Sequence, residues 1–218
     1  MKAYFISGLG ADRRVFYKIQ LPPDYQPLHL DWIEPLPNEN FSDYAKRFSK
    51  LITRDEDFIL IGLSFGGMLV TELAKIIAPK KTIIISSVSC YQELPWYFKL
   101  AGKLGFQKML TPSIYKQATI LNRFMGPGSK EMKQIVYDYV RRTDPKFIRW
   151  SLNEILRWNQ NNRLSGLIHI HGSNDHLLPC RYTHADYVVK KGGHLMVMNR
   201  AKEVNKILEQ VLNHTRER

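Results

Sequence analysis

Cysteine and long hydrophobic runs are both scarce in this chain of 218 residues. The two cysteines, Cys90 and Cys180, stand at unrelated positions and form no disulfide framework, which favours a reducing compartment. The longest apolar runs, such as residues 82–85, have the length of a strand and fall far short of the ~20 residues that span a bilayer. The chain also enters its first expected strand directly after Met1, which argues against a cleavable signal peptide. We therefore expect a cytoplasmic protein without a membrane span.

Acidic residues are few as well, since 20 aspartates and glutamates stand against 32 lysines and arginines, for a formal net charge of +12. The excess is concentrated in residues 97–163, which hold thirteen basic and four acidic residues. Such a segment can attract an acidic substrate, for example a carboxylate, a phosphate or a coenzyme A thioester. The alternative is that these charges are only solvated helix faces. Nucleic-acid binding is not predicted, because no recognition helix or aromatic strand platform accompanies the charge.

Metal-binding patterns are absent too. The seven histidines include no H-x-x-x-H pair, and the cysteines form no pair with ligand spacing. We therefore expect neither a metal nor another cofactor. His169 and His171 lie two apart on one expected strand, a spacing that favours packed and hydrogen-bonded side chains on one face.

What the sequence does contain is an alternation of strand and helix patterns. Apolar runs that suit strands covered on both faces occur at residues 3–6, 28–30, 58–61, 82–86, 167–171 and 187–189. Between and after them, apolar residues recur at helical spacing, most clearly at 44–52 and 204–212. Asp12 is expected to cap a helix at 13–19, and Ser42-Asp43 to start the one that runs to residue 52. This order predicts an α/β protein with a mostly parallel, doubly wound sheet of about six strands.

The third expected strand runs into Gly62-Leu63-Ser64-Phe65-Gly66, and a helical pattern begins directly afterwards. A serine on such a sharp turn exposes its hydroxyl at the edge of a sheet. The two glycines have a steric reason, because a turn this tight leaves no room for a Cβ at their positions. Ser64 is therefore a candidate nucleophile, although a glycine-rich turn can also be only a backbone device.

Two further side chains complete the set that a serine nucleophile needs. Asp175 follows the strand at 167–171, where a carboxylate can accept a hydrogen bond from an imidazole. His194 follows the strand at 187–189 in a glycine-rich loop. The order nucleophile, acid, histidine is the one expected for this arrangement of strands and helices. The alternative for Asp175 is that it caps a turn.

With these residues the chain resembles the α/β-hydrolase family over nearly its whole length. The resemblance implies that Ser64 is the nucleophile, Asp175 the acid and His194 the general base. It also implies an oxyanion hole made by two backbone N–H groups, those of Phe65 and Leu9. The family often has a histidine just before the glycine of the Leu9 loop, where this chain has a serine. The donor is main chain, so this departure does not remove its chemistry.

Residues 95–163 interrupt the strand pattern with helical runs rich in aromatic residues, one of them expected at 114–124. In the α/β-hydrolase family an insertion at this point forms a helical cap over the nucleophile. The resemblance therefore divides the chain into a core of residues 1–94 and 164–218 and a cap of residues 95–163. The two leading antiparallel strands of the family are missing, and little room is left for a helix before the last strand. We expect a trimmed form of the fold.

These features together predict a serine hydrolase, an esterase or thioesterase, that cleaves a small and in some cases anionic acyl substrate through an acyl-enzyme. Two alternatives stay open. Some members of this fold use the same triad for carbon–carbon bond cleavage or a lyase step, and others have become non-catalytic ligand receptors. The sequence leaves the acyl group, the leaving group and the oligomeric state open, and it indicates no partner other than the small-molecule substrate.

Overall fold

The computed structural model describes residues 1–105 and 130–213 and contains one sheet of six strands in the order β2-β1-β3-β4-β5-β6. Every pair of neighbouring strands is parallel. The strands are β1 Lys2–Ile6, β2 Gln26–Leu30, β3 Phe58–Leu63, β4 Lys81–Ile85, β5 Leu167–Gly172 and β6 Tyr187–Val189. All six expected strands are confirmed, and none of the described residues forms an antiparallel strand ahead of β1.

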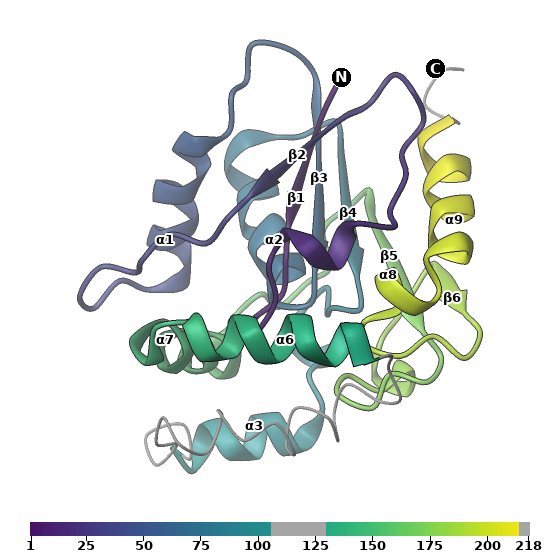
Figure 1. The fold of residues 1–218 in the computed structure, drawn as a ribbon. Helices are drawn as coiled ribbons and strands as arrows, with labels where there is room; N and C mark the ends of the chain where they lie inside the picture. The colour runs from purple at the N-terminus through teal and green to yellow at the C-terminus, as the bar shows by residue number, and fades with distance from the viewer. Residues whose placement is uncertain (106–129, 214–218) are drawn as a thin grey trace.

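Helices connect the strands and lie on both sides of the sheet (Figure 1). The α-helices are α1 Phe41–Phe48, α2 Phe65–Ile77, α3 Trp96–Lys103, α6 Lys130–Arg142, α7 Pro145–Arg157, α8 Met196–Asn199 and α9 Ala201–Asn213. Short 3₁₀ turns occur at η1 Arg13–Phe16, η2 Ser49–Leu51, η3 Tyr91–Glu93 and η5 Cys180–Tyr182. Between β5 and β6 the chain forms only the 3₁₀ turn η5, which agrees with the expectation that little room is left for a helix there. The helix expected at 114–124 lies outside the described residues.

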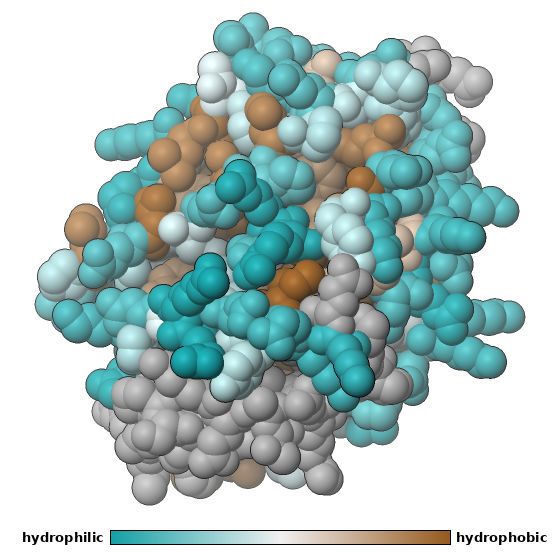
Figure 2. Space-filling view, in the orientation of Figure 1, coloured by the Kyte–Doolittle hydropathy of each residue, from teal (hydrophilic) through white to brown (hydrophobic). Residues whose placement is uncertain are grey.

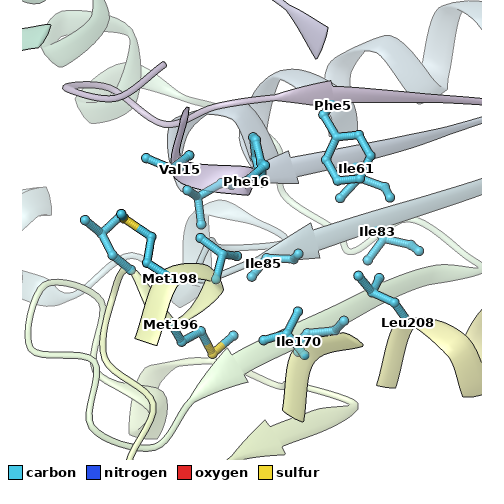
Figure 3. Packing of buried hydrophobic residues seen from close by; sticks show 14 of the residues in the cluster. Phe5, Val15, Phe16, Ile61, Ile83, Ile85, Ile170, Met196, Met198 and Leu208 are labelled. Atoms are coloured by element: carbon cyan, nitrogen blue, oxygen red, sulfur yellow. The ribbon is translucent and has the colours of Figure 1, made fainter. Parts of the chain in front are cut away.

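The central strands are apolar at successive positions because both of their faces are covered. On β3, Ile59 and Ile61 join the core on the side of η1 and α9, whereas Phe58 and Leu60 join the core on the side of α1 and α2. Figure 3 shows the first of these cores, in which side chains of neighbouring strands meet those of η1, α8 and α9. Its labelled members include Phe5, Ile83, Ile85, Phe16, Met196 and Leu208.

Two expected helices differ from the prediction, one in where it begins and the other in its type and length. α1 begins at Phe41 because Asn40 caps it, its side-chain oxygen accepting the N–H of Asp43 at 3.0 Å. The expected helix at 13–19 is only the 3₁₀ turn η1, which ends at Phe16. Asp12 is its cap, as predicted, and accepts the N–H of Arg14 at 3.0 Å.

The order of the strands places a crevice at one end of the sheet. β2 lies outside β1, and β3 lies on the other side of β1, so the chain reverses its direction of travel across the sheet between β1 and β3. Loops that leave the carboxyl ends of two such strands diverge and leave room for a ligand. Figure 1 shows α6 and α7 lying across these carboxyl ends, with α3 beyond them.

Outside the grey atoms, hydrophilic residues predominate on the face of the molecule seen in Figure 2, and hydrophobic residues lie between them, mainly in the upper half. In the part of the chain that the structure describes, no helix combines the length and the apolar character needed to cross a membrane.

Candidate active site

Ser64 alone makes the turn between β3, which ends at Leu63, and α2, which begins at Phe65. Its φ of 53° lies in a region that residues other than glycine rarely adopt. Hydrogen bonds on both sides hold this backbone in place. The Ser64 N–H donates to the Ile85 carbonyl at 2.9 Å, and the Ser87 hydroxyl donates to the Ser64 carbonyl at 2.7 Å. The strained turn is therefore fixed by the end of β4.

The two glycines of the turn, Gly62 and Gly66, are packed closely against backbone atoms of other residues. A Cβ on Gly62 would lie 2.3 Å from the Gly66 carbonyl oxygen, and a Cβ on Gly66 would lie 2.3 Å from the Ile6 carbonyl oxygen. Both distances are shorter than any real Cβ contact, and neither obstacle is a side chain that could rotate away. The steric reason predicted for these glycines is confirmed.

The structure brings together the three side chains that the sequence singled out. The His194 Nε2 atom lies 2.9 Å from the Ser64 Oγ, and its Nδ1 lies 2.8 Å from the Asp175 Oδ2. Since a carboxylate can only accept, Nδ1 carries the proton and donates a hydrogen bond to Asp175. Nε2 is then free to accept the hydrogen bond of the Ser64 hydroxyl. Asp175 is 3% exposed and His194 4%, so water competes little for either bond.

The Asp175 carboxylate makes both kinds of contact that the sequence suggested for it, one to an imidazole and one to the backbone of a turn. Its Oδ1 accepts the N–H groups of Leu177 and Leu178, each at 2.9 Å, so the side chain does cap a turn. Its Oδ2 remains for His194. Burial alone would raise the pKa of Asp175, but the charge of His194 and the hydrogen bonds from His194 and Leu178 outweigh it and lower the pKa below its ordinary value. The carboxylate is therefore ionised at neutral pH.

Behind Asp175 lies a pair of fully buried histidines on β5. The His171 Nε2 donates to the Leu178 carbonyl at 2.7 Å and lies 3.5 Å from the Asp175 Oδ2. That leaves its Nδ1 as an acceptor, 3.0 Å from the His169 Nε2. Burial lowers the pKa of both rings, and that of His169 falls to about 3. The packed, hydrogen-bonded arrangement expected for these two histidines is confirmed.

The buried histidines make the stability of the fold depend on pH. In the unfolded chain they take up protons below about pH 6.5, whereas in the fold their pKa is lower, so the unfolded state binds more protons at mildly acid pH. The contribution of these two histidines to the free energy of unfolding is therefore fully present above pH 6.5, and it is lost as the pH is lowered from there. We expect His169 alone to reduce the free energy of unfolding by about 2 kcal/mol at pH 5 relative to pH 7.5. Urea unfolding at both pH values measures this.

A variant separates the histidine effect from other acid sensitivity. His169→Gln keeps the volume and a hydrogen-bonding group but has no proton to take up, so the difference in stability between pH 7.5 and pH 5 should shrink by about 2 kcal/mol. An unchanged difference in this variant would show that another group is responsible.

The loop after β1 is a tight turn beside Ser64. The Ala11 N–H donates to the Gly8 carbonyl at 3.2 Å, and Gly10 takes a φ of 82°, which few other residues adopt. The Ser7 hydroxyl donates to the Ala11 carbonyl at 2.8 Å, so the residue that departs from the family pattern fastens this loop. Within the described chain, the N–H groups of Leu9 and Phe65 donate to no other atom, and both residues line the space above Ser64.

Ser64 and His194 open onto a cavity of about 210 Å³. Apart from these two, the described residues around it are glycines or apolar residues. They come from the loops at the carboxyl ends of the strands, from α2, and from the described helices α3, α6 and α7. They include Leu9, Phe98, Val136, Ile148, Leu152 and Leu177. No lysine or arginine is among them, so the described lining gives no support to the expected attraction of an acidic substrate.

The residues of the helices that line the cavity were not identified from the sequence. Ile148, Leu152 and Ile155 recur at the i, i+4, i+7 spacing of one helix face, which was a usable signal for a buried side of α7. That spacing does not reveal which core or cavity a face meets. In residues 1–105 and 130–213, no three histidine, cysteine, aspartate or glutamate side chains could hold a metal ion, and Cys90 and Cys180 are free thiols.

Comparison with known proteins gives a family and several similar folds. A sequence model of the Alpha/beta hydrolase family matches residues 3–207. No curated protein gives a significant match to the sequence. Among solved structures, a bromoperoxidase from Bacillus anthracis shares 15% identity with a TM-score of 0.71, over 97% of this chain and 91% of that one.

Two other solved structures are similar to the same extent. A thermophilic esterase from Thermogutta terrifontis shares 13% identity with a TM-score of 0.73, over 98% of this chain and 90% of that one. A lipase-esterase related protein from Clostridium acetobutylicum shares 17% identity with a TM-score of 0.66, over 95% and 92%. At such identities the likeness concerns the fold. Together with the family match over almost the whole chain, it shows that the protein belongs to the alpha/beta hydrolase family of enzymes.

Proposed function

We propose that the protein is a serine hydrolase that cleaves a carboxylic ester or thioester through an acyl-enzyme on Ser64. The observation that carries the proposal is the succession of hydrogen bonds from Ser64 through His194 to Asp175, at 2.9 and 2.8 Å, at the wall of an apolar cavity. No metal or cofactor takes part in the proposed reaction.

In the first step the Ser64 Oγ attacks the carbonyl carbon of the substrate, and its proton passes to the His194 Nε2. The C–O bond that forms converts the carbonyl into a tetrahedral oxyanion. Asp175 holds the imidazole in the tautomer that can accept this proton and stabilises the resulting cation. When the oxyanion collapses, the bond to the leaving alcohol or thiol breaks, and the leaving group takes the proton from His194.

In the second step water takes the place of the leaving group. His194 removes a proton from the water molecule, whose oxygen attacks the acyl carbon and forms a second tetrahedral oxyanion. Collapse of this intermediate breaks the bond to the Ser64 Oγ, which regains its proton from the imidazole. The products are the free carboxylic acid and the enzyme in its starting protonation state.

The proposed donors for both oxyanions are the N–H groups of Leu9 and Phe65, which flank Ser64 at the cavity wall. The Phe65 N–H stands at the first turn of α2, where backbone donors have no partner within the helix. A single donor of this kind contributes about 3 kcal/mol to the stability of the transition state. Both donors are main chain, so no side-chain replacement removes them.

We also propose that residues 95–163 form a cap on a core of residues 1–94 and 164–218. In support, α3, α6 and α7 supply cavity wall opposite the strand ends, through Phe98, Val136 and Leu152. A cap of this kind keeps water away from the acyl-enzyme except where the second step needs it.

A fluorophosphonate probe tests the proposal, because it reacts with a serine only when that serine is an activated nucleophile. We expect one adduct per chain, located on Ser64 by peptide mapping, and complete loss of labelling in Ser64→Ala. Ser165→Ala, which removes an exposed serine, is the matched control and should label like the wild type. Folded protein that takes up no probe would count against the hydrolase and favour a non-catalytic receptor. Labelling of a residue other than Ser64 would show that Ser64 is not the nucleophile.

A further inference from the structure

We infer that the cavity above Ser64 is an acyl pocket that takes an uncharged aliphatic chain of about six to eight carbons. The substrate class is then an ester or thioester of a medium-length aliphatic monocarboxylic acid. This inference rests on the proposed function, which it makes specific.

The chemistry of the lining decides against a charged acyl group. Ile148, Leu152 and Ile155 of α7 contribute aliphatic surface to the cavity. Apart from Ser64 and His194, which the reaction itself occupies, no described lining residue has a side chain that could pair with a carboxylate or phosphate on the acyl chain. A charged group that enters such a site loses its water without a partner in return. The basic residues of α7 lie elsewhere: Lys146 and Arg149 line a separate, open groove against residues 38–40. The positive charge of α7 is thus outside the acyl pocket.

The volume of the cavity sets the length of the chain. An apolar cavity of about 150 Å³ holds one benzene ring, which has six carbons. By the same measure, a cavity of about 210 Å³ corresponds to about eight carbon atoms. The carbonyl carbon must lie within reach of the Ser64 Oγ, so the count includes it. Longer chains have to displace the wall.

The α7 wall is fastened to the core and cannot easily move aside. The Trp150 Nε1 donates to the Glu39 carbonyl at 2.7 Å, and the buried Trp158 Nε1 donates to the Glu72 Oε1 at 2.8 Å. The centroid of the Trp150 ring also lies 4.5 Å from the centroid of the Tyr44 ring. These contacts hold both the middle and the end of α7, so we expect a defined cut-off in chain length.

A series of p-nitrophenyl esters from two to twelve carbons, kept below micelle-forming concentrations, tests the length. We expect kcat/KM to rise about fourfold per methylene until the cavity is full at six to eight carbons. It should then fall at least about tenfold by twelve carbons, because the longer chain no longer fits. Acetate esters of alcohols with two to ten carbons should show no such optimum, since the pocket holds the acyl side.

Charge is tested with a pair of similar shape. Mono-p-nitrophenyl adipate ends in a carboxylate where p-nitrophenyl heptanoate ends in a methylene and a methyl group. We expect kcat/KM to be at least about 100-fold lower for the adipate. Arg149→Gln, on the other side of α7, should leave both values unchanged.

Two substitutions of Leu152 change the size of the pocket in opposite directions. Leu152→Trp should move the optimum at least two carbons shorter, and Leu152→Ala at least one carbon longer, so the pair stays informative if one variant does not fold. A flat chain-length profile, an optimum in the alcohol series, or an adipate that reacts as fast as the heptanoate would overturn the inference. The labelling of Ser64 by the fluorophosphonate would still stand in each case. Loss of that labelling in the wild type would instead remove the proposed function itself.

Discussion

Replacement of Asp175 by asparagine is expected to lower kcat by about 10⁴-fold while the fold stays intact. The amide has the shape of the carboxylate but can donate its N–H₂ to the His194 Nδ1, which then no longer carries a proton. The proton moves to Nε2, the atom that must accept from Ser64, and the imidazole cannot act as a base. Steady-state kinetics with p-nitrophenyl hexanoate, together with thermal unfolding, measure both parts of the prediction.

Asp12 offers a matched control for the same chemical change. It is a partly buried aspartate on the loop that carries Leu9, but its carboxylate is taken up by the N–H and guanidinium of Arg14. Asparagine caps a helix about as well as aspartate, so Asp12→Asn should change kcat by less than about threefold. If both variants lost activity equally, or if Asp175→Asn kept it, Asp175 would not be the acid of the triad.

Replacement of Gly66 by alanine is expected to reduce the free energy of unfolding by about 3 kcal/mol or more. The added Cβ would lie 2.3 Å from the Ile6 carbonyl oxygen and 2.4 Å from that of Ser7. Both obstacles are backbone at the end of β1, so β1 and α2 have to move apart to make room. The same movement displaces Ser64 and Leu9, so labelling of Ser64 should be lost as well. Urea unfolding and fluorophosphonate labelling are the two measurements.

The neighbouring Gly67 shows how the obstacle decides the outcome. There a new Cβ would lie 2.4 Å from the Ser87 Oγ, which belongs to a side chain. Gly67→Ala should therefore destabilise the fold, and the second substitution Ser87→Gly should restore part of the loss by removing that side chain. No single truncation can relieve Gly66→Ala. Wild-type stability in Gly66→Ala would contradict the close packing of the turn on β1.

The strands, and the convergence of Ser64, Asp175 and His194, could be predicted because their signals are local and ordered. The apolar runs around Ile61 and Ile83 mark strands whose two faces are both buried. The turn at Ser64 needs glycine at fixed distances, and the remaining two residues stand at the ends of later strands, in the order that a parallel sheet brings to one edge.

Other features depend on contacts between distant segments and carry little local signal. Nothing in the sequence near Phe41 indicates that its N–H donates a hydrogen bond to the carboxylate of Glu154, which lies on a helix more than a hundred residues away in the chain. The His171 ring is fixed by the carbonyl of Leu178, on the loop that Asp175 closes. The described walls of the cavity come from seven separate segments of the chain, so neither its size nor its apolar character could be derived from any one of them. The hypothesis of an acidic substrate was based on the net charge of a segment. Net charge does not reveal which face of a helix carries the charged side chains.

The most direct test of the account is to quench turnover of p-nitrophenyl hexanoate with acid within milliseconds. The mass of the peptide that carries Ser64 is then determined by mass spectrometry. The activated leaving group makes acylation fast, so the acyl-enzyme should accumulate before water removes the chain. The account predicts a burst of one p-nitrophenol per chain and a hexanoyl group on Ser64, absent in Ser64→Ala. Turnover that proceeds with Ser64 unmodified, or that continues undiminished in Ser64→Ala, would contradict it.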